Sequence, residues 1–120
     1  MLARNRNTPA RILEQLAKDP DEDVRWEVAE NPSATPRALG WLAKDSQVRV
    51  LEGVARNPYT PPQILARLAR CSNKTVRARV AANTSTPPKV LAKLAKDTER
   101  YVRYYAMNNP FTPPGAVKEE

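Results

Sequence analysis

The sequence predicts an all-α repeat solenoid, in which short helices stack along one axis and no β-sheet forms. The first observation is a period of 26 residues that no insertion or deletion interrupts. The second is that leucine, valine and proline recur at fixed positions within each period, so that each unit has one apolar side that only its neighbours can cover. The period is carried most clearly by asparagine, at Asn5, Asn31, Asn57, Asn83 and Asn109.

The composition agrees with a thin, layered core. Hydrophobic residues make up 41% of the chain but aromatic residues only 6%, so the apolar mass is leucine, valine and alanine. Proline is abundant at 12 residues and glycine rare at 3, which excludes collagen-like and flexible-linker classes. The sequence therefore predicts a single solenoid domain over residues 1–120, with about four and a half repeats.

The first element of each unit is an expected helix of about 10 residues, seen clearly over residues 60–69. Thr60 is expected to cap it, with proline in the first turn and Gln63 completing a capping box. Leu65 and Leu68 then fall on one apolar stripe at helical spacing. This is the longer of the two elements that the pattern predicts in each unit.

The second element is expected to be shorter, as in residues 76–82. Val76 and Val80 lie four residues apart and would line one side of about two turns. A segment this short fits an α-helix or a 3₁₀ helix equally well. The asparagine that follows, Asn83 here, is expected to end the helix in the left-handed conformation and to join a hydrogen-bonded ladder across units.

Two units depart from the pattern. In the second unit the Thr-Pro pair, Thr35-Pro36, is displaced by one residue while the leucines keep their register. In the next short element Leu51 replaces the usual arginine, and Gly53 is expected to weaken the helix. Neither departure resembles a catalytic motif.

Written out, the repeat resembles the leucine-rich repeat variant family of bacterial proteins. The resemblance rests on Val-Arg-x-x-Val-Ala-x-Asn-Pro-x-Thr-Pro-Pro-x-x-Leu-x-x-Leu-Ala-x-Asp and extends from Leu2 to about Val117. It implies a right-handed superhelix of alternating α and 3₁₀ helices. The strand pattern of ordinary leucine-rich repeats is absent, which excludes their horseshoe.

No cofactor, metal or catalytic residue is expected. One member of the family carries a cysteine-ligated iron–sulfur cluster, which needs about four cysteines, whereas this chain has only Cys71. The chain has no histidine, no glycine-rich phosphate loop and no nucleophile elbow. The sequence therefore predicts a non-enzymatic interaction scaffold.

Charge indicates where that scaffold would bind. The chain has 20 Lys and Arg against 13 Asp and Glu, and no acidic residue lies between Glu52 and Asp97. In-register stacking should place basic residues in rows, and a basic and aromatic cluster follows them. The candidate surface comprises Arg67, Arg70, Arg77, Lys93, Lys96, Arg100, Tyr101, Arg103, Tyr104 and Tyr105.

A protein partner is favoured for this surface, and non-specific nucleic-acid binding through the basic rows of the third and fourth repeats is the alternative. The alternative to a binding role is that Tyr104 and Trp26, which share one position in the repeat, simply pack between units. The single cysteine and the absence of an apolar leader or membrane span favour the cytoplasm. Neither end shows a polar cap, so the ends fray or pack on another copy end to end, and the chain is alternatively a piece of a longer repeat protein.

Overall fold

The computed structural model describes residues 2–117, and within that range every regular element is a helix. The predicted all-α class is thereby confirmed for the described part of the chain. Two short 3₁₀ helices, η1 (Leu2–Arg4) and η2 (Pro114–Val117), flank eight α-helices. The α-helices are α1 (Ala10–Leu16), α2 (Glu22–Glu30), α3 (Pro36–Leu42), α4 (Val48–Arg56), α5 (Pro62–Leu68), α6 (Lys74–Ala82), α7 (Pro88–Leu94) and α8 (Arg100–Met107).

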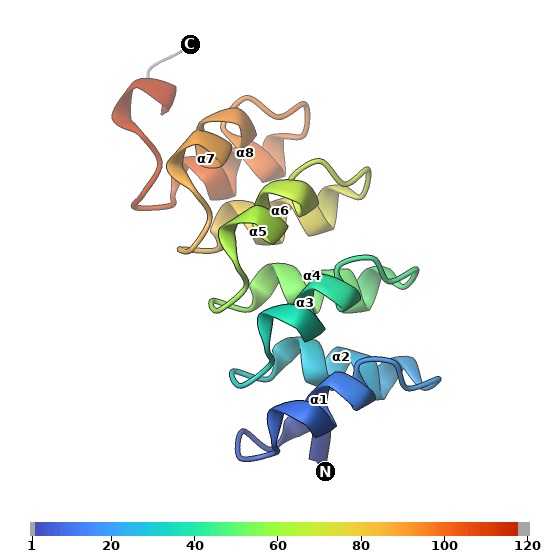
Figure 1. Ribbon diagram of the computed structural model, residues 1–120. Coiled ribbons are helices and arrows are strands. Elements are labelled where there is room, and N and C mark those ends of the chain that lie inside the picture. The colour runs from blue at the N-terminus through green and yellow to red at the C-terminus, as the bar shows by residue number, and fades with distance from the viewer. Residues whose placement is uncertain (1, 118–120) are drawn as a thin grey trace.

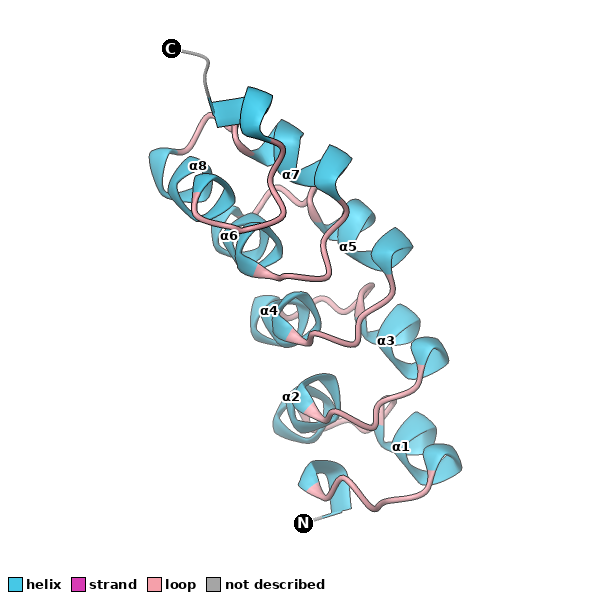
Figure 2. Ribbon diagram, turned by 90° about the vertical axis from the view of Figure 1, so that its left-hand side faces the viewer, coloured by secondary structure: helices cyan, strands magenta, loops and turns pink. Residues whose placement is uncertain are grey.

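The helices form two layers. Figure 2 shows the odd-numbered helices α1, α3, α5 and α7 on one side and the even-numbered helices on the other. The even helices pack in series, α2 on α4, α4 on α6 and α6 on α8. The described chain is elongated, with extents of 47 × 23 × 19 Å, and its two ends lie far apart (Figure 1).

The core lies between the layers and consists of the residues that carry the period. The leucines Leu13, Leu39, Leu65 and Leu91 are each fully buried. Burying one such side chain stabilises the folded state by about 1.5–3 kcal/mol relative to leaving it exposed. Because each unit contributes the same leucine and valine, the core runs along the axis as a ribbon.

The relative lengths of the two elements were predicted wrongly. The proline-led helix, expected to be the longer, has seven residues, and the other is an α-helix of nine residues in α2, α4 and α6. The even helices are longer because loop residues before the valines join them. In α6 the Asn73 carboxamide accepts hydrogen bonds from the N–H groups of Thr75 and Val76, so the helix begins at Lys74.

The capping box predicted for Thr60 and Gln63 is also wrong. Pro61 occupies the N-cap of α5, and the Thr60 hydroxyl instead donates to the carbonyl of Val54, 2.7 Å away, at the end of the preceding even helix. Thr35 does cap its helix, accepting from the N–H of Ala38 at 3.1 Å. The one-residue displacement in the second unit therefore converts this threonine from a loop clamp into an N-cap.

The period asparagines end the even helices, but not in the left-handed conformation. Asn57 has φ −71° and ψ 118°, and no residue with positive φ occurs in the described chain. The expected ladder across units is confirmed, with each asparagine side chain bonding to backbone carbonyls of the preceding unit. The Asn57 amide donates to the carbonyls of Ala29, at 2.8 Å, and Asn31, at 3.1 Å, in the preceding unit. Its Oδ1 accepts from the N–H of Tyr59 at 2.8 Å.

The helix α4 runs unbroken through Gly53, and packing explains the glycine. A Cβ at Gly53 would lie 2.9 Å from the Cβ of Ala29 and 3.3 Å from Cδ1 of Trp26. Ala29 is fully buried and its Cβ is fixed to the backbone of α2, so it cannot turn away. Glycine thus permits the close approach of α4 to α2 at this point.

This contact predicts opposite effects for two glycine-to-alanine substitutions. Gly53→Ala should lower the free energy of unfolding by about 1–2 kcal/mol, because overpacking outweighs the gain in helix propensity. Gly40→Ala, in α3, places its Cβ 3.7 Å from Cδ1 of Ile64, an ordinary contact, and should raise it by about 0.5–1 kcal/mol. Urea denaturation of both variants measures the difference, and stabilisation by Gly53→Ala would contradict the packing argument.

Candidate functional site

The outer side of the odd helices carries three rows of exposed side chains. In each odd helix and the turn after it, the rows are spaced four and then three residues apart, which places them on one stripe. Corresponding positions in successive units extend each row along the molecule. The rows are Arg11, Arg37, Gln63 and Lys89; Gln15, Trp41, Arg67 and Lys93; and Lys18, Lys44, Arg70 and Lys96.

All twelve side chains are exposed, and nine of them are cations. We call this surface the basic face. In the part of the chain that the structure describes, none of its cations has a carboxylate oxygen within 4.0 Å. The cations are Arg11, Lys18, Arg37, Lys44, Arg67, Arg70, Lys89, Lys93 and Lys96.

The even helices differ in this respect. Every cation of the ion pairs found within residues 2–117 lies on α2, α4 or α6. Arg49, for example, pairs with Asp23 of the preceding unit at 2.5 Å, and Arg56 approaches Glu30 at 3.8 Å. The ion pairs of α2, α4 and α6 thus neutralise part of the positive charge on one side, whereas the cations of the basic face have no carboxylate partner among the described residues, which concentrates a positive potential over the odd helices.

The basic face is hollowed between successive odd helices. The hollow between α1 and α3 has a volume of about 410 Å³ and includes Arg11, Lys18, Arg37 and Trp41 in its lining. A second, of about 470 Å³, lies between α5 and α7, with Arg70 and Lys93 in its lining. Basic side chains thus line the grooves that run between helices.

The structure divides the sequence-predicted residues among three places. Arg67, Arg70, Lys93 and Lys96 lie together on the basic face, over α5 and α7. Sequence reasoning missed the same rows in the first two units, at Arg11, Lys18, Arg37 and Lys44, because it searched for a stretch without acids. The repeat register itself carried the signal, since the acids of those units project from other positions.

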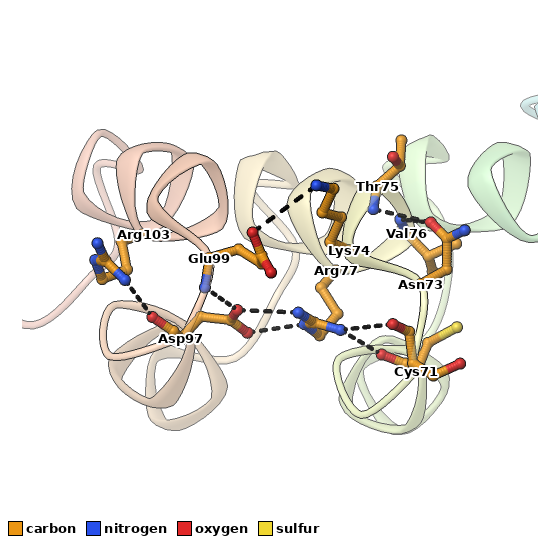
Figure 3. A network of polar contacts seen from close by, with 10 residues as sticks. Cys71, Asn73, Lys74, Thr75, Val76, Arg77, Asp97, Glu99 and Arg103 are labelled. Carbon is orange, nitrogen blue, oxygen red and sulfur yellow. Dashed lines mark hydrogen bonds and ion pairs between the residues drawn. The ribbon is translucent and has the colours of Figure 1, made fainter.

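Arg77 lies between the layers, within a polar network rather than on the basic face (Figure 3). Its Nε and Nη2 donate to the two carboxylate oxygens of Asp97, at 2.8 and 3.1 Å. Its Nη1 donates to the carbonyls of Cys71 and Ser72, at 2.8 and 3.1 Å. Arg103 donates to the carbonyl of Asp97 at 2.7 Å. The contacts of these two arginines join loops and helices inside the molecule.

The electrostatics of this network hold both groups charged. The hydrogen bond to Asp97 raises the pKa of Arg77 above its ordinary value. Burial alone would raise the pKa of Asp97, but hydrogen bonds from Arg77 and from the Glu99 N–H, with the charges of Arg77 and Arg103, lower it below the usual value. An equivalent bidentate pair joins Arg25 to Asp45, between the first and second units, at 2.7 and 3.2 Å.

Between the second and third units, uncharged residues replace both the arginine and the aspartate of this pair. Leu51 stands where the arginine would be, and Cys71 where the aspartate would be. Both are partly buried and pack against the core. The departure seen at Leu51 in the sequence is therefore matched by its structural neighbour, and no charge is left without its counterpart.

The remaining predicted residues lie on α8. Tyr105 is partly buried and makes edge-to-face contacts with Tyr101 and Tyr104, with ring centroids 5.7 and 5.4 Å apart. Tyr101 and Tyr104 are 43% and 57% exposed, and Arg100 is exposed. The tyrosines form one cluster as expected, but on the layer of even helices, away from the rows of α5 and α7.

Comparison with protein-family models, with curated proteins and with solved structures returns no match for this chain. Within the described residues no three His, Cys, Asp or Glu side chains gather as metal ligands would. None of the helices there combines the length and the apolar character that crossing a bilayer requires.

Proposed function

We propose that this chain is a solenoid scaffold of the leucine-rich repeat variant kind, without catalytic activity, that binds nucleic acid through its basic face. The observation that carries the proposal is the set of nine exposed cations that have no carboxylate partner within residues 2–117 and that are aligned in rows over all four odd helices. Repeat stacking presents such rows as an extended surface, and the superhelix would be right-handed as in that family. The single free cysteine fits a cytoplasmic location.

The makeup of the face favours nucleic acid over the protein partner that the sequence favoured. The centre of a protein interface is normally depleted of charged residues, lysine above all, and enriched in aromatic and apolar side chains. The basic face has the opposite composition, with Trp41 its single aromatic residue. A phosphate backbone, by contrast, needs repeated point charges and no apolar centre.

Four neutralising substitutions test this function. The variant removes the cations over α5 and α7, as Arg67→Gln, Arg70→Gln, Lys93→Gln and Lys96→Gln. Its affinity for a mixed-sequence oligonucleotide should fall about 100-fold or more at 50 mM salt. The slope of log K against log salt should fall by about 3 to 4, because each phosphate contact contributes nearly one unit. Fluorescence anisotropy over a salt series measures both quantities.

A matched control removes the same charge from exposed positions outside the basic face, as Arg6→Gln, Arg49→Gln, Arg56→Gln and Lys74→Gln. It should retain most of the affinity, because the rows remain intact. An equal loss in both variants would assign binding to net charge alone. If the wild-type chain does not bind at 50 mM salt, nucleic-acid binding is excluded.

Protein binding is the second candidate, favoured by a different surface. Tyr101, Tyr104 and Met107 of α8 are 43%, 57% and 47% exposed and lie close together in the sequence. Exposed tyrosine and methionine are typical of protein interfaces. The predicted end-to-end association would use this end of the molecule, and light scattering over a concentration range tests it: a constant monomer mass excludes a second copy.

A further inference from the structure

We propose that Trp41, with the hollows beside it, stacks on an unpaired nucleobase, so that the basic face binds single-stranded nucleic acid in preference to duplex. The proposal rests on the function proposed above and specifies its ligand. Trp41 is 56% exposed and belongs to the middle row of the basic face. It is the one aromatic side chain among the twelve of the basic face.

The fold does not require this tryptophan. The corresponding positions in the other units are Gln15, Arg67 and Lys93, all polar and exposed. Trp26 provides the contrast: it is partly buried, packs against the core and lies beside the position where a Cβ of Gly53 would be. Packing of the core therefore does not explain why position 41 is a tryptophan.

The surroundings of Trp41 suit a nucleotide. The residue lines the hollow of about 410 Å³ between α1 and α3, and also a neighbouring hollow that includes Lys44. Ligand pockets commonly measure about 300–1,000 Å³. The Lys18 ammonium lies 4.3 Å from the centre of the indole ring, so the ring already attracts a group to its face. A base that entered either hollow would meet the indole.

Charge places phosphates around that base. Arg11 and Arg37 occupy the same position in successive helices and both line the hollow, while Lys18 and Lys44 form the next row. Packed helices lie about 8–10 Å apart, so a strand that crosses from α1 to α3 meets a new pair of cations at that interval. The carboxylate of the first hollow, on Glu14, accepts a hydrogen bond from the Thr35 hydroxyl at 2.8 Å. The second hollow also contains Asp19 and Asp45, of which Asp45 pairs with Arg25 at 2.7 Å.

An exposed indole on a charged surface discriminates between the two forms of nucleic acid. In a duplex the faces of the bases are stacked on one another and are closed to an aromatic side chain, so the phosphates are the main contact for the basic rows. In a single strand the bases are free to stack on an aromatic side chain, which strengthens binding without sequence preference. The basic face should thus bind both forms through phosphates, and a single strand additionally through Trp41.

The test compares Trp41→Gln, which introduces the residue of the first unit, with Trp41→Phe, which keeps an aromatic ring. The probes are an oligothymidine, a duplex of equal phosphate number and an oligonucleotide without bases. Trp41→Gln should lower the affinity for oligothymidine about 10-fold or more, with an unchanged salt slope and unchanged duplex binding. Trp41→Phe should lower it only a few-fold. The strand without bases should bind the wild-type chain as weakly as oligothymidine binds Trp41→Gln.

The outcomes separate the two proposals. If the wild-type chain binds none of the probes at 50 mM salt, nucleic-acid binding and base stacking both fail. If it binds, but Trp41→Gln leaves the affinity for oligothymidine unchanged or lowers duplex binding equally, base stacking is overturned while phosphate binding stands. Circular dichroism of both variants shows that the helices are intact, which is expected because the side chain is exposed.

Discussion

Asn57→Ala is expected to lower the free energy of unfolding by about 3–5 kcal/mol. The Asn57 side chain is 3% exposed and makes three hydrogen bonds, two donated to the preceding unit and one accepted from its own turn. Alanine would remove all three hydrogen bonds, two of them buried, and would leave a cavity. The Asn31 carbonyl keeps the N–H of Ala34, so the largest cost comes from the Ala29 carbonyl, at about 1–3 kcal/mol for a buried group that loses its partner. Urea denaturation followed by circular dichroism measures the change.

Asn5→Ala is the matched control, because the same residue type occupies the same register position but its side chain makes no hydrogen bond to another unit among the described residues. Asn5 is exposed, and its side chain accepts a single hydrogen bond, from the N–H of Asn7 at 2.8 Å. The expected loss is about 0.5–1 kcal/mol. Asn57→Asp keeps the acceptor but removes the donor, so it should cost at least as much as alanine. Equal losses at positions 5 and 57 would show that the ladder contributes little.

Asp97→Asn is expected to lower the free energy of unfolding by about 2–3 kcal/mol near pH 7, since it removes the charged acceptor of two hydrogen bonds from Arg77. The effect should depend on pH. The pKa of Asp97 is lower in the folded chain than the value of about 3.9 expected for an unfolded aspartate. The stabilisation is therefore complete above about pH 4 and is lost as the pH falls through the folded pKa.

The measurement is the difference in unfolding free energy between the wild-type chain and Asp97→Asn, followed by urea denaturation from pH 7 down to pH 2. It should be constant at neutral pH and shrink below about pH 4. Glu99→Gln is the control, because Glu99 approaches Lys74 only at 3.9 Å and the two side chains are 44% and 60% exposed. Its effect should stay below about 0.5 kcal/mol. A difference at Asp97 that persisted undiminished at pH 2 would assign the effect to packing.

Much of the local structure was predictable, for reasons that particular residues illustrate. Leu65 and Val76 recur with helical spacing and with the period, so their burial followed from the sequence. The role of Thr60 did not, because a hydroxyl beside a proline is able to cap the next helix or to clamp the previous one, as it does here through Val54. The length of α6 was missed because Asn73 caps through its side chain from outside the apolar pattern.

The candidate surface was only half predictable. The rows through Arg67 and Arg70 were visible from the period, but Arg77 was placed with them because charge alone does not show which arginines have partners. The structure shows that Asp97, twenty residues away along the chain, binds Arg77. It also shows that cations of the acid-rich first units, such as Lys18 and Lys44, have no carboxylate within 4.0 Å in the described part of the chain.

By itself the sequence determined the repeat, the helical class and the identity of the core, because these depend on local periodicity and on apolar burial, which are encoded within each unit. Tertiary structure alone decided which charges are neutralised. Ion pairs and the asparagine ladder join residues 20 to 28 positions apart, so they exist only once the units are stacked. That stacking pairs six cations of α2, α4 and α6 and leaves those of the basic face without a carboxylate partner in the described chain, and the proposed binding face results from this asymmetry.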